Sequence, residues 1–360
     1  MVQKITENVT NSIQPILREA FGWPGYLAAY DRGKATFGFF EDTHLMGVIV
    51  CGLIDTPSNG RIGVVKYVAT LKKVQGRGAA SALTDASLAW FEEQKCDEVA
   101  ACVEGYNTAS SQLFEKRGFK PRPFLWQLKR YRWQLPKVWL LSNHFFDQGH
   151  FWWSKTEDDN DTPPLKPQGF WVFVLTLMLF VGFLMRQTIP LTLETVGGVF
   201  GGLVLISVIR YGPMVWTARW LKYPLVYKGW ETSVLLTAFV MWVMGGIFYA
   251  PGGLYPDKKN WREDQERRIL ANIHLPGLLS LSFLQIVWLG LMHGTSWLDG
   301  RETMANVWFL MISFALIFDV WFAFFPVDSF AGGRVRKVYP KVWVVIALSS
   351  LVTLFVAHRL

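Results

Sequence analysis

The chain has 360 residues, of which 51% are hydrophobic, 16% aromatic and only 18% charged. This composition excludes a disordered chain and a small disulfide-bonded scaffold, and it is more apolar than that of most soluble proteins. The net charge of +8 is divided evenly, at +4 on either side of residue 150. Neither half is therefore a polycation of the nucleic-acid-binding type, and we expect no nucleic-acid partner.

Residues 1–150 alternate between short β-rich segments and helical patterns. The Gly, Pro, Asn and Asp residues between positions 55 and 60 are typical of a tight turn between two strands. The pattern predicts an α+β domain with a mixed, mainly antiparallel sheet. In chain order we expect a helix at Asn11–Ala20, an antiparallel meander of strands at Ala35–Glu41, Leu45–Ile54 and Arg61–Leu71, a helix at Ala79–Gln94, a strand at Glu98–Glu104, a helix at Ala109–Arg117 and a strand at Leu125–Arg132.

Residues 151–168 include an acidic, proline-rich stretch that is too polar to bury a core. We interpret it as a linker between a domain at residues 1–150 and a second domain at residues 169–360. The N-terminal stretch Met1–Gln14 has no apolar core of the kind found in signal peptides. We therefore expect the first domain in the cytosol, at a prokaryotic-type cytoplasmic membrane.

Residues 169–360 consist mainly of long uncharged runs, which are the signature of transmembrane helices. The sequence predicts an all-α polytopic membrane domain of about six spans, with the lipid bilayer as its surroundings. Glycines at positions 197, 198, 201 and 202 predict close helix packing, and the many tryptophans predict interfacial belts and contacts with membrane protein partners. The expected spans are residues 169–186, 193–209, 231–250, 269–292, 303–325 and 341–357.

The three cysteines, Cys51, Cys96 and Cys102, all lie in the first domain and form no Cys-x-x-Cys pair. This pattern is typical of reduced, buried thiols in a reducing compartment. We therefore expect neither disulfides nor metal ligands among them.

A glycine-rich turn at residues 75–80 joins a predicted strand to a predicted helix. Such a turn presents backbone N–H groups at a helix N-terminus, where the helix dipole also favours negative charge. Small residues at Gly76, Gly78 and Ala80 would let a phosphate group approach, and Lys72, Lys73 and Arg77 would supply positive charge. A plain strand-to-helix connection is the alternative for this segment taken alone.

A second motif, Asn107-x-x-Ala-x-x-Leu-Phe-x-x-x-Gly118-Phe119, follows the first. Together with Gln75-x-x-Gly78-x-Ala80, it resembles the GNAT N-acetyltransferase family over about residues 10–132. The resemblance implies binding of acetyl-CoA or another acyl-CoA. It implies that backbone groups of Val68 and Thr70 pair with the pantetheine arm between two splayed strands, and that Asn107 contacts that arm. It also implies that amides of Gln75, Gly76, Arg77, Gly78, Ala79 and Ala80 bind the pyrophosphate.

The sequence departs from this family at two catalytic positions. Phe114 stands where the family usually has a tyrosine that protonates the leaving thiolate, and the strand at residues 61–71 contains no glutamate. Glu104, on the following strand, is the nearest candidate for the general base. A salt-bridged structural carboxylate is the alternative for this residue.

Residues 191–357 resemble prokaryotic site-2-type intramembrane zinc proteases, in an Ala-Pro-Gly-Gly-x-Tyr segment ending at Tyr255 and in the segment from Phe325 to Val335. The zinc chemistry is missing. A zinc protease of this kind needs two histidines one helical turn apart, a carboxylate ligand and a glutamate. Here the corresponding positions carry Ile209–Met214 and Ala331, so we expect a degenerate pseudoprotease scaffold without a metal. A different site built from His274, His293 and Asp319 is the disfavoured alternative.

Two functions are compatible with these patterns. The first is a membrane-tethered GNAT-like N-acyltransferase that transfers an acetyl group to an amine near the membrane, such as a protein N-terminus, a lysine or an aminolipid. The second is a catalytically silent structural or accessory subunit of a larger membrane protein complex. Phe114 and the missing zinc ligands favour the second, and the cofactor motifs favour the first.

Overall fold

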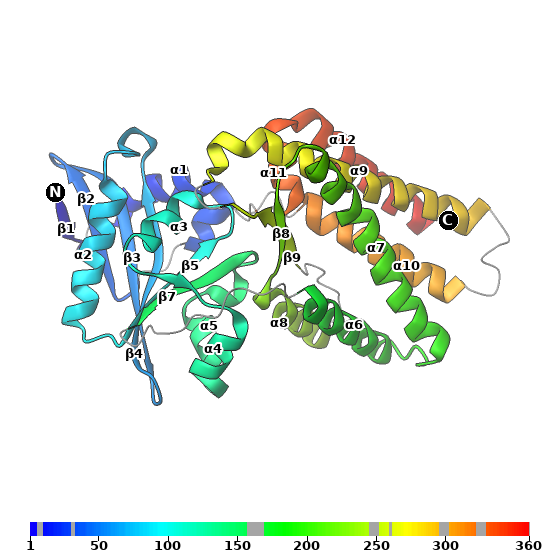
Figure 1. Ribbon diagram of the computed structural model, residues 1–360, viewed down its shortest axis with the longest axis horizontal. Helices are drawn as coiled ribbons and strands as arrows, with labels where there is room; N and C mark the ends of the chain where they lie inside the picture. Colours follow the sequence, from blue (N-terminus) through cyan, green and yellow to red (C-terminus); the bar gives the residue numbers. More distant parts are fainter. Residues whose placement is uncertain are drawn as a thin grey trace. The chain divides into compact units, whose positions relative to one another are not determined.

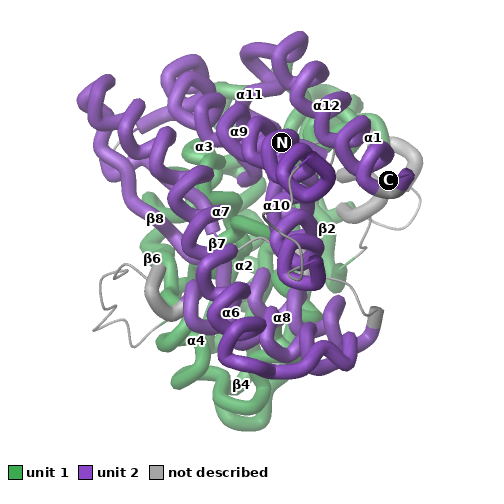
Figure 2. The backbone as a smooth tube through the Cα atoms, turned by 90° about the vertical axis from the view of Figure 1, so that its right-hand side faces the viewer, with its two compact units in different colours: residues 1–165 green, residues 166–360 purple. Residues whose placement is uncertain are grey.

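The computed structural model describes residues 1–5, 10–29, 33–156, 169–244, 252–258, 261–294, 302–321 and 329–359. The chain folds into two compact units, residues 1–165 and residues 166–360 (Figure 2). We refer to them as the N-terminal unit and the C-terminal unit.

The N-terminal unit is built on a seven-stranded sheet with the order β1-β2-β3-β4-β5-β7-β6. Strands β2, β3 and β4 form the predicted antiparallel meander, and β4 and β5 pair in parallel. The strands are β1 (Val2–Lys4), β2 (Ala35–Glu41), β3 (His44–Thr56), β4 (Gly60–Thr70), β5 (Glu98–Glu104), β6 (Lys120–Pro121) and β7 (His150–Thr156).

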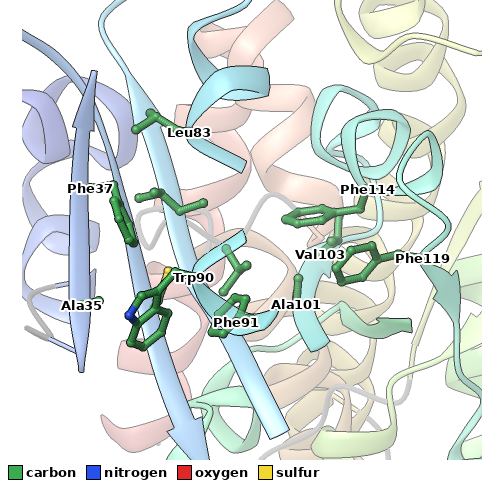
Figure 3. Packing of buried hydrophobic residues seen from close by; sticks show 12 residues of the cluster. Ala35, Phe37, Leu83, Trp90, Phe91, Ala101, Val103, Phe114 and Phe119 are labelled. Carbon is green, nitrogen blue, oxygen red and sulfur yellow. The ribbon is translucent and has the colours of Figure 1, made fainter. Parts of the chain in front are cut away.

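Helices cover both faces of this sheet because the strands alternate two buried sets of side chains. On one face, α2 (Ala79–Glu93) and α3 (Thr108–Glu115) pack on a core that includes Leu83, Phe91 and Phe114 (Figure 3). On the other face, α1 (Thr10–Ala29) packs on a smaller cluster that includes Val48 and Val50. Figure 1 shows α2 lying along the strands of the meander.

The stretch from residue 122 to residue 149 differs from the sequence-based prediction. Residues Phe124–Tyr131 form helix α4, so the strand predicted at Leu125–Arg132 is wrong. Gln127 and Tyr131, four residues apart, share the buried face of this helix, and Pro123 precedes its first turn. A 3-10 turn at Arg132–Gln134, helix α5 (Leu135–Leu141) and the 3-10 turn η4 (His144–Phe146) follow.

Strand β7 closes the sheet by pairing with β5 along seven residues and with β6 along two. Residues 151–156, which we expected at the start of the linker, are therefore part of the sheet. Trp152, at 0% exposure, and Ser154 point into the fold, which explains why this segment is ordered as a strand. The acidic, proline-rich residues 157–168 lie outside the described residues.

The C-terminal unit is mainly helical. Four of its described helices are long and apolar enough to cross a membrane, at Leu193–Trp220, Glu263–Gly294, Glu302–Trp321 and Pro340–Ala357. The predicted count of about six spans is not confirmed, because the apolar helices at residues 172–186 and 231–243 are shorter. The elements are α6 (Gly169–Arg186), α7 (Leu193–Trp220), β8 (Leu225–Gly229), α8 (Glu231–Phe239), a π-helical turn (Val240–Met244), β9 (Gly252–Pro256), α9 (Glu263–Gly294), α10 (Glu302–Trp321), α11 (Ala331–Val338) and α12 (Pro340–Arg359).

Small residues allow the long helices to pack closely, as the sequence predicted. A Cβ atom on Gly202 of α7 would lie 3.2 Å from the Trp308 ring of α10, and one on Gly198 would overlap Met304. Gly277 of α9 faces the backbone of Arg210 on α7, where a Cβ would lie 2.5 Å from the carbonyl oxygen. A larger side chain at Gly277 would push α9 away from α7.

Candidate functional site

Strands β4 and β5 pair only over the first part of their length. The parallel register runs from Ile62 opposite Glu98 to Val65 opposite Ala101 and ends there. Beyond this point β4 still pairs with β3 as far as Thr70, and β5 still pairs with β7 as far as Glu104. In the described structure, the facing edges of the two strands are thus no longer joined by ladder hydrogen bonds, and the sheet opens at this place as the family resemblance implied.

The predicted glycine-rich turn follows directly after β4. Gly76 and Gly78 adopt φ angles of +78° and +82°, a left-handed conformation that costs glycine little. A Cβ atom on either residue would have nothing within 4 Å, so the space outside the turn is open. Gly78 is the N-cap residue of α2 and supplies no side-chain hydrogen bond to the first turn. The N-terminus of α2 therefore has no side-chain cap and lies beside open space.

Core packing and surface charge surround this turn. The side chain of Val74, fully buried with Met46 and Ala79, fixes the base of the turn in the N-terminal unit. Arg77 is 65% exposed and approaches the Glu41 carboxylate at 3.5 Å, a weak surface contact. The guanidinium of Arg77 is therefore able to turn toward an anion at the α2 N-terminus.

The second motif forms helix α3 and the turn after it. Asn107 is the N-cap of α3, and its side-chain oxygen accepts a hydrogen bond from the Ser110 amide at 3.0 Å. Phe114 is only 3% exposed, and its ring centroid lies 5.1 Å from that of Phe119 in the main core (Figure 3). Asn107 is thus placed at the open end of β5, whereas Phe114 fills the core.

Glu104 is the last residue of β5, beyond the point where β5 separates from β4. Its side chain is only 8% exposed, and its carboxylate accepts a hydrogen bond from the Tyr106 amide at 2.8 Å. The residue faces His150 of β7 in the sheet register. Glu104 is therefore a nearly buried carboxylate beside the opened part of the sheet.

A different carboxylate lies at the paired end of β5 and was not singled out from the sequence. Glu98 is 1% exposed and accepts a hydrogen bond of 2.5 Å from the Tyr131 hydroxyl, which in turn accepts one from the Trp152 indole. Burial raises the pKa of Glu98, although Tyr131 and the Arg130 guanidinium at 3.3 Å oppose this shift. These contacts hold α4 against the sheet. These contacts were not predicted, because residues 125–132 were expected to form a strand.

The cysteines are free thiols in the described structure, as predicted. Burial raises the pKa of Cys51 to about 12 and that of Cys96 to about 11. At neutral pH these two side chains are therefore protonated and poorly nucleophilic.

In the C-terminal unit, the positions that resemble the protease metal site hold other contacts. The Arg210 guanidinium, on α7, donates hydrogen bonds to both carboxylate oxygens of Asp319 on α10, at 2.6 and 2.5 Å. His274 is bonded through Nδ1 to the Leu270 carbonyl, and Ala331 is buried at the start of α11. The structure therefore does not bring His274, His293 and Asp319 together as a metal site in the described residues. Asp328 and residues 245–251 lie outside the described residues.

Comparison with known protein families gives a match in the N-terminal unit. Residues 7–119 match the acetyltransferase (GNAT) family, which confirms the resemblance of the N-terminal half. The match does not extend into the C-terminal unit, so the likeness of residues 191–357 to site-2-type proteases stays a prediction. A comparison with curated proteins gives no match.

Solved structures of similar fold include Arabidopsis thaliana Naa50 in complex with the bisubstrate analogue CoA-Ac-MVNAL, at 14% identity and a TM-score of 0.34 over 43% of this chain and 97% of that chain. The NatC complex bound to Gag peptide and CoA aligns at 16% identity and a TM-score of 0.32, over 43% of this chain and 97% of that chain. The ribosomal-protein-S18-alanine N-acetyltransferase of Escherichia coli aligns at 12% identity and a TM-score of 0.32, over 45% of this chain and 99% of that chain.

Proposed function

We propose, starting from the match of residues 7–119 to the GNAT acetyltransferase family, that the chain is a membrane-attached N-acyltransferase that uses acetyl-CoA or another acyl-CoA. In this reaction an amine attacks the thioester carbonyl, a C–N bond forms, the C–S bond breaks and free CoA leaves. The acceptor is an amine close to the membrane, namely a protein N-terminus, a lysine or an aminolipid.

The observation that carries this proposal is the opened sheet next to an open glycine turn. Strand β4 stops pairing with β5 after Val65, so the backbone of Val68 and Thr70 is available to hydrogen-bond an extended ligand laid along the strand. The pantetheine arm of CoA carries two amide groups suited to this role. Amides of Gly76, Gly78, Ala79 and Ala80 would then hold the pyrophosphate at the α2 N-terminus, because the amides of Gln75 and Arg77 already donate to the carbonyls of Lys72 and Val74. Asn107 would contact the arm at the end of β5.

Glu104 has the placement needed for the general base. It would accept a proton from the acceptor ammonium group, so that the neutral amine can attack the thioester. Its existing hydrogen bond from the Tyr106 amide would fix the carboxylate orientation during this step. The leaving thiolate would take its proton from solvent, because Phe114 has no proton to donate. Positioning of the two substrates would supply most of the rate.

The four long apolar helices support attachment to a membrane. They connect to the N-terminal unit through residues 157–168, which contain four acidic residues and three prolines, including Pro163 and Pro164. A chain of this composition resists collapse and acts as a spacer. An acyltransferase carried on such a spacer would meet acceptors at the membrane surface at a raised effective concentration.

The alternative function is a catalytically silent subunit of a membrane complex. The burial of Phe114 at the position of the family's tyrosine favours it, because this side chain serves the core and offers no acid. In this alternative the N-terminal unit retains the fold without turnover. Binding and turnover therefore have to be measured separately.

The test uses the full chain purified in mild detergent. Titration calorimetry with acetyl-CoA should show one binding site per chain, and thiol release in the presence of amine-terminated peptides or aminolipids should show turnover. Absence of binding by either acetyl-CoA or CoA would overturn the proposal. Binding without thiol release, together with copurification of a stoichiometric partner set, would favour the silent subunit.

A further inference from the structure

A cluster of three metal-ligating side chains lies in the N-terminal unit, apart from the glycine turn. The Sγ atom of Cys102, a ring nitrogen of His144 and a carboxylate oxygen of Asp147 all lie within 4.8 Å of one another. Cys102 comes from the middle of β5, and the other two come from η4 and the residue after it. The chain brings these groups together from positions more than forty residues apart.

A second observation, independent of the distances, is that His144 in this cluster lacks a hydrogen-bond partner. Its side chain is 0% exposed, and neither ring nitrogen has a hydrogen-bond partner among the described residues. The rings of Trp139 and Trp152 pack against it, with centroids 5.2 and 5.6 Å away, so water is excluded from these sides. Buried polar groups are rarely left without a partner, and each exception requires an explanation.

The neighbouring positions keep this arrangement fixed. Cys102 is directly opposite Trp152 in the β5–β7 register, and the Trp152 indole donates to the Tyr131 hydroxyl at 3.0 Å. The Asp147 amide donates to the His144 carbonyl at 3.0 Å, which closes the turn that carries both ligands. The three ligand atoms are therefore presented by a rigid strand and a hydrogen-bonded turn.

We propose that Cys102, His144 and Asp147 bind a zinc ion that clamps β5 to the connection between α5 and β7. Ligand atoms around a tetrahedral zinc ion stand about 3.5 Å apart, because the bonds to zinc are roughly 2.0–2.3 Å long. The three ligand atoms would therefore move about an ångström closer to one another when zinc binds. A fourth position is left for water or for His150.

The chemistry of the donors selects zinc over calcium or magnesium. Thiolate and imidazole are soft or intermediate ligands that hard alkaline-earth ions do not favour. Binding converts the Cys102 thiol into a thiolate and releases its proton, so that thiolate, carboxylate and Zn²⁺ form a neutral assembly suited to a buried place.

The experiment uses the full chain in detergent, freed of metal with a chelator and then titrated with zinc or cobalt chloride. Zinc should bind at one equivalent per chain, and cobalt should give a thiolate-to-metal charge-transfer band with the strong visible absorption of a tetrahedral site. Cys102→Ser and Asp147→Asn each remove a zinc ligand. Each should weaken zinc binding more than the loss of a residue that merely hydrogen-bonds to a ligand, which costs roughly 10–100-fold. The matched control Cys96→Ser, at a half-buried cysteine outside the cluster, should bind zinc as the wild type does.

A measurement on the unaltered chain avoids any folding defect of the variants. Alkylation by iodoacetamide, mapped by mass spectrometry, should show that zinc protects Cys102 and leaves the reactivity of Cys96 unchanged. Equal alkylation of Cys102 with and without zinc, or a cobalt spectrum without thiolate charge transfer, would overturn the proposal and identify His144 as an unliganded core histidine. Neither result depends on acyl-CoA binding or on acyltransferase activity.

Discussion

Arg210 of α7 and Asp319 of α10 form a bidentate ion pair in the interior of the C-terminal unit, and their side chains are 5% and 1% exposed. The same guanidinium donates a hydrogen bond to the Tyr211 hydroxyl, which donates to the Gly252 carbonyl of β9. The pair therefore links two long apolar helices and the two-stranded β8–β9 sheet.

Removal of one partner of this pair should be strongly destabilising. Asp319→Asn leaves a buried guanidinium without its counter-charge, and such changes cost about 3–5 kcal/mol. The loss is measured as a fall in the free energy of unfolding of the full chain in detergent. Asp264→Asn, which breaks an exposed pair with Arg262, is the matched control and should change the free energy of unfolding far less, because water screens an exposed ion pair. Equal effects of the two changes would show that the buried pair has no special role.

Substitution of Gly78 should weaken acyl-CoA binding. Gly78→Ala places a Cβ in the open space at the α2 N-terminus, where the pyrophosphate is proposed to lie, and we expect a Kd raised by about tenfold, equivalent to about 1.4 kcal/mol. Gly118→Ala is the matched control because Gly118 has a similar φ of +85° at a turn outside the proposed site. Calorimetry with acetyl-CoA on both variants separates ligand contact from backbone strain. Similar Kd values for the two variants would argue against a pyrophosphate site at this turn.

Glu104→Gln should reduce turnover without altering cofactor binding. The amide retains an acceptor for the Tyr106 N–H but cannot take a proton from the acceptor amine, so kcat should fall by roughly 10²–10⁴-fold. Thiol release measures the rate, and calorimetry checks that the Kd for acetyl-CoA stays within about twofold, which is under about 0.4 kcal/mol. Glu98→Gln, on the same strand but at its paired end, should retain normal turnover. A full rate in Glu104→Gln would remove the carboxylate from the mechanism.

The buried carboxyl of Glu98 should make folding stability depend on pH. Burial raises its pKa in the folded state, so the folded chain binds this proton more tightly than the unfolded chain, whose glutamate pKa is about 4.3. Stability from this group is present below that value and is lost as the pH rises through the folded pKa. Relative to wild type, Glu98→Gln should therefore gain stability as the pH rises from about 4 toward neutrality.

Thermal unfolding of the full chain at a series of pH values measures this trend. Glu93→Gln, which alters the same net charge at an exposed position of α2, serves as the control and should show a constant difference from wild type. A wild-type chain that gains stability over Glu98→Gln with rising pH would show that Tyr131 and Arg130 outweigh the burial of the carboxyl.

The sequence was sufficient for most of the N-terminal unit as far as Phe119, although it missed β1 and predicted only the first half of α1. Alternating strands, the glycine turn and the helix after it are local patterns, and the structure places β2 to β5, α2 and α3 where these patterns predicted. Local patterns failed at α4, where a run that includes Trp126, Leu128 and Tyr131 alternates apolar and polar residues like a strand. Contacts with Glu98 and Trp152 from distant strands decide the helix instead.

The polar contacts between distant segments could not be predicted for the same reason. Cys102 and His144 lie on separate elements with no ligand spacing between them, and only the folded sheet brings them together. The sequence also did not identify the ion pair between Arg210 of α7 and Asp319 of α10. Apolar runs alone do not show whether a helix is long enough to cross a membrane, since residues 231–239 form a short helix that is followed by a π-helical turn at residues 240–244.

Strand β7 has a consequence for how the protein is made. The sheet needs residues 150–156 beside β5 and β6, so a fragment that stops at residue 150 would lack the strand that joins its edge to its centre. During synthesis, the ribosome reaches Thr156 only thirteen residues before the first apolar helix begins at Gly169. In the membrane-attached protein that we propose, the last step of N-terminal folding and the delivery of the hydrophobic helices to the membrane insertion machinery would follow each other closely, and slow closure of β7 would expose an unfinished sheet edge during insertion.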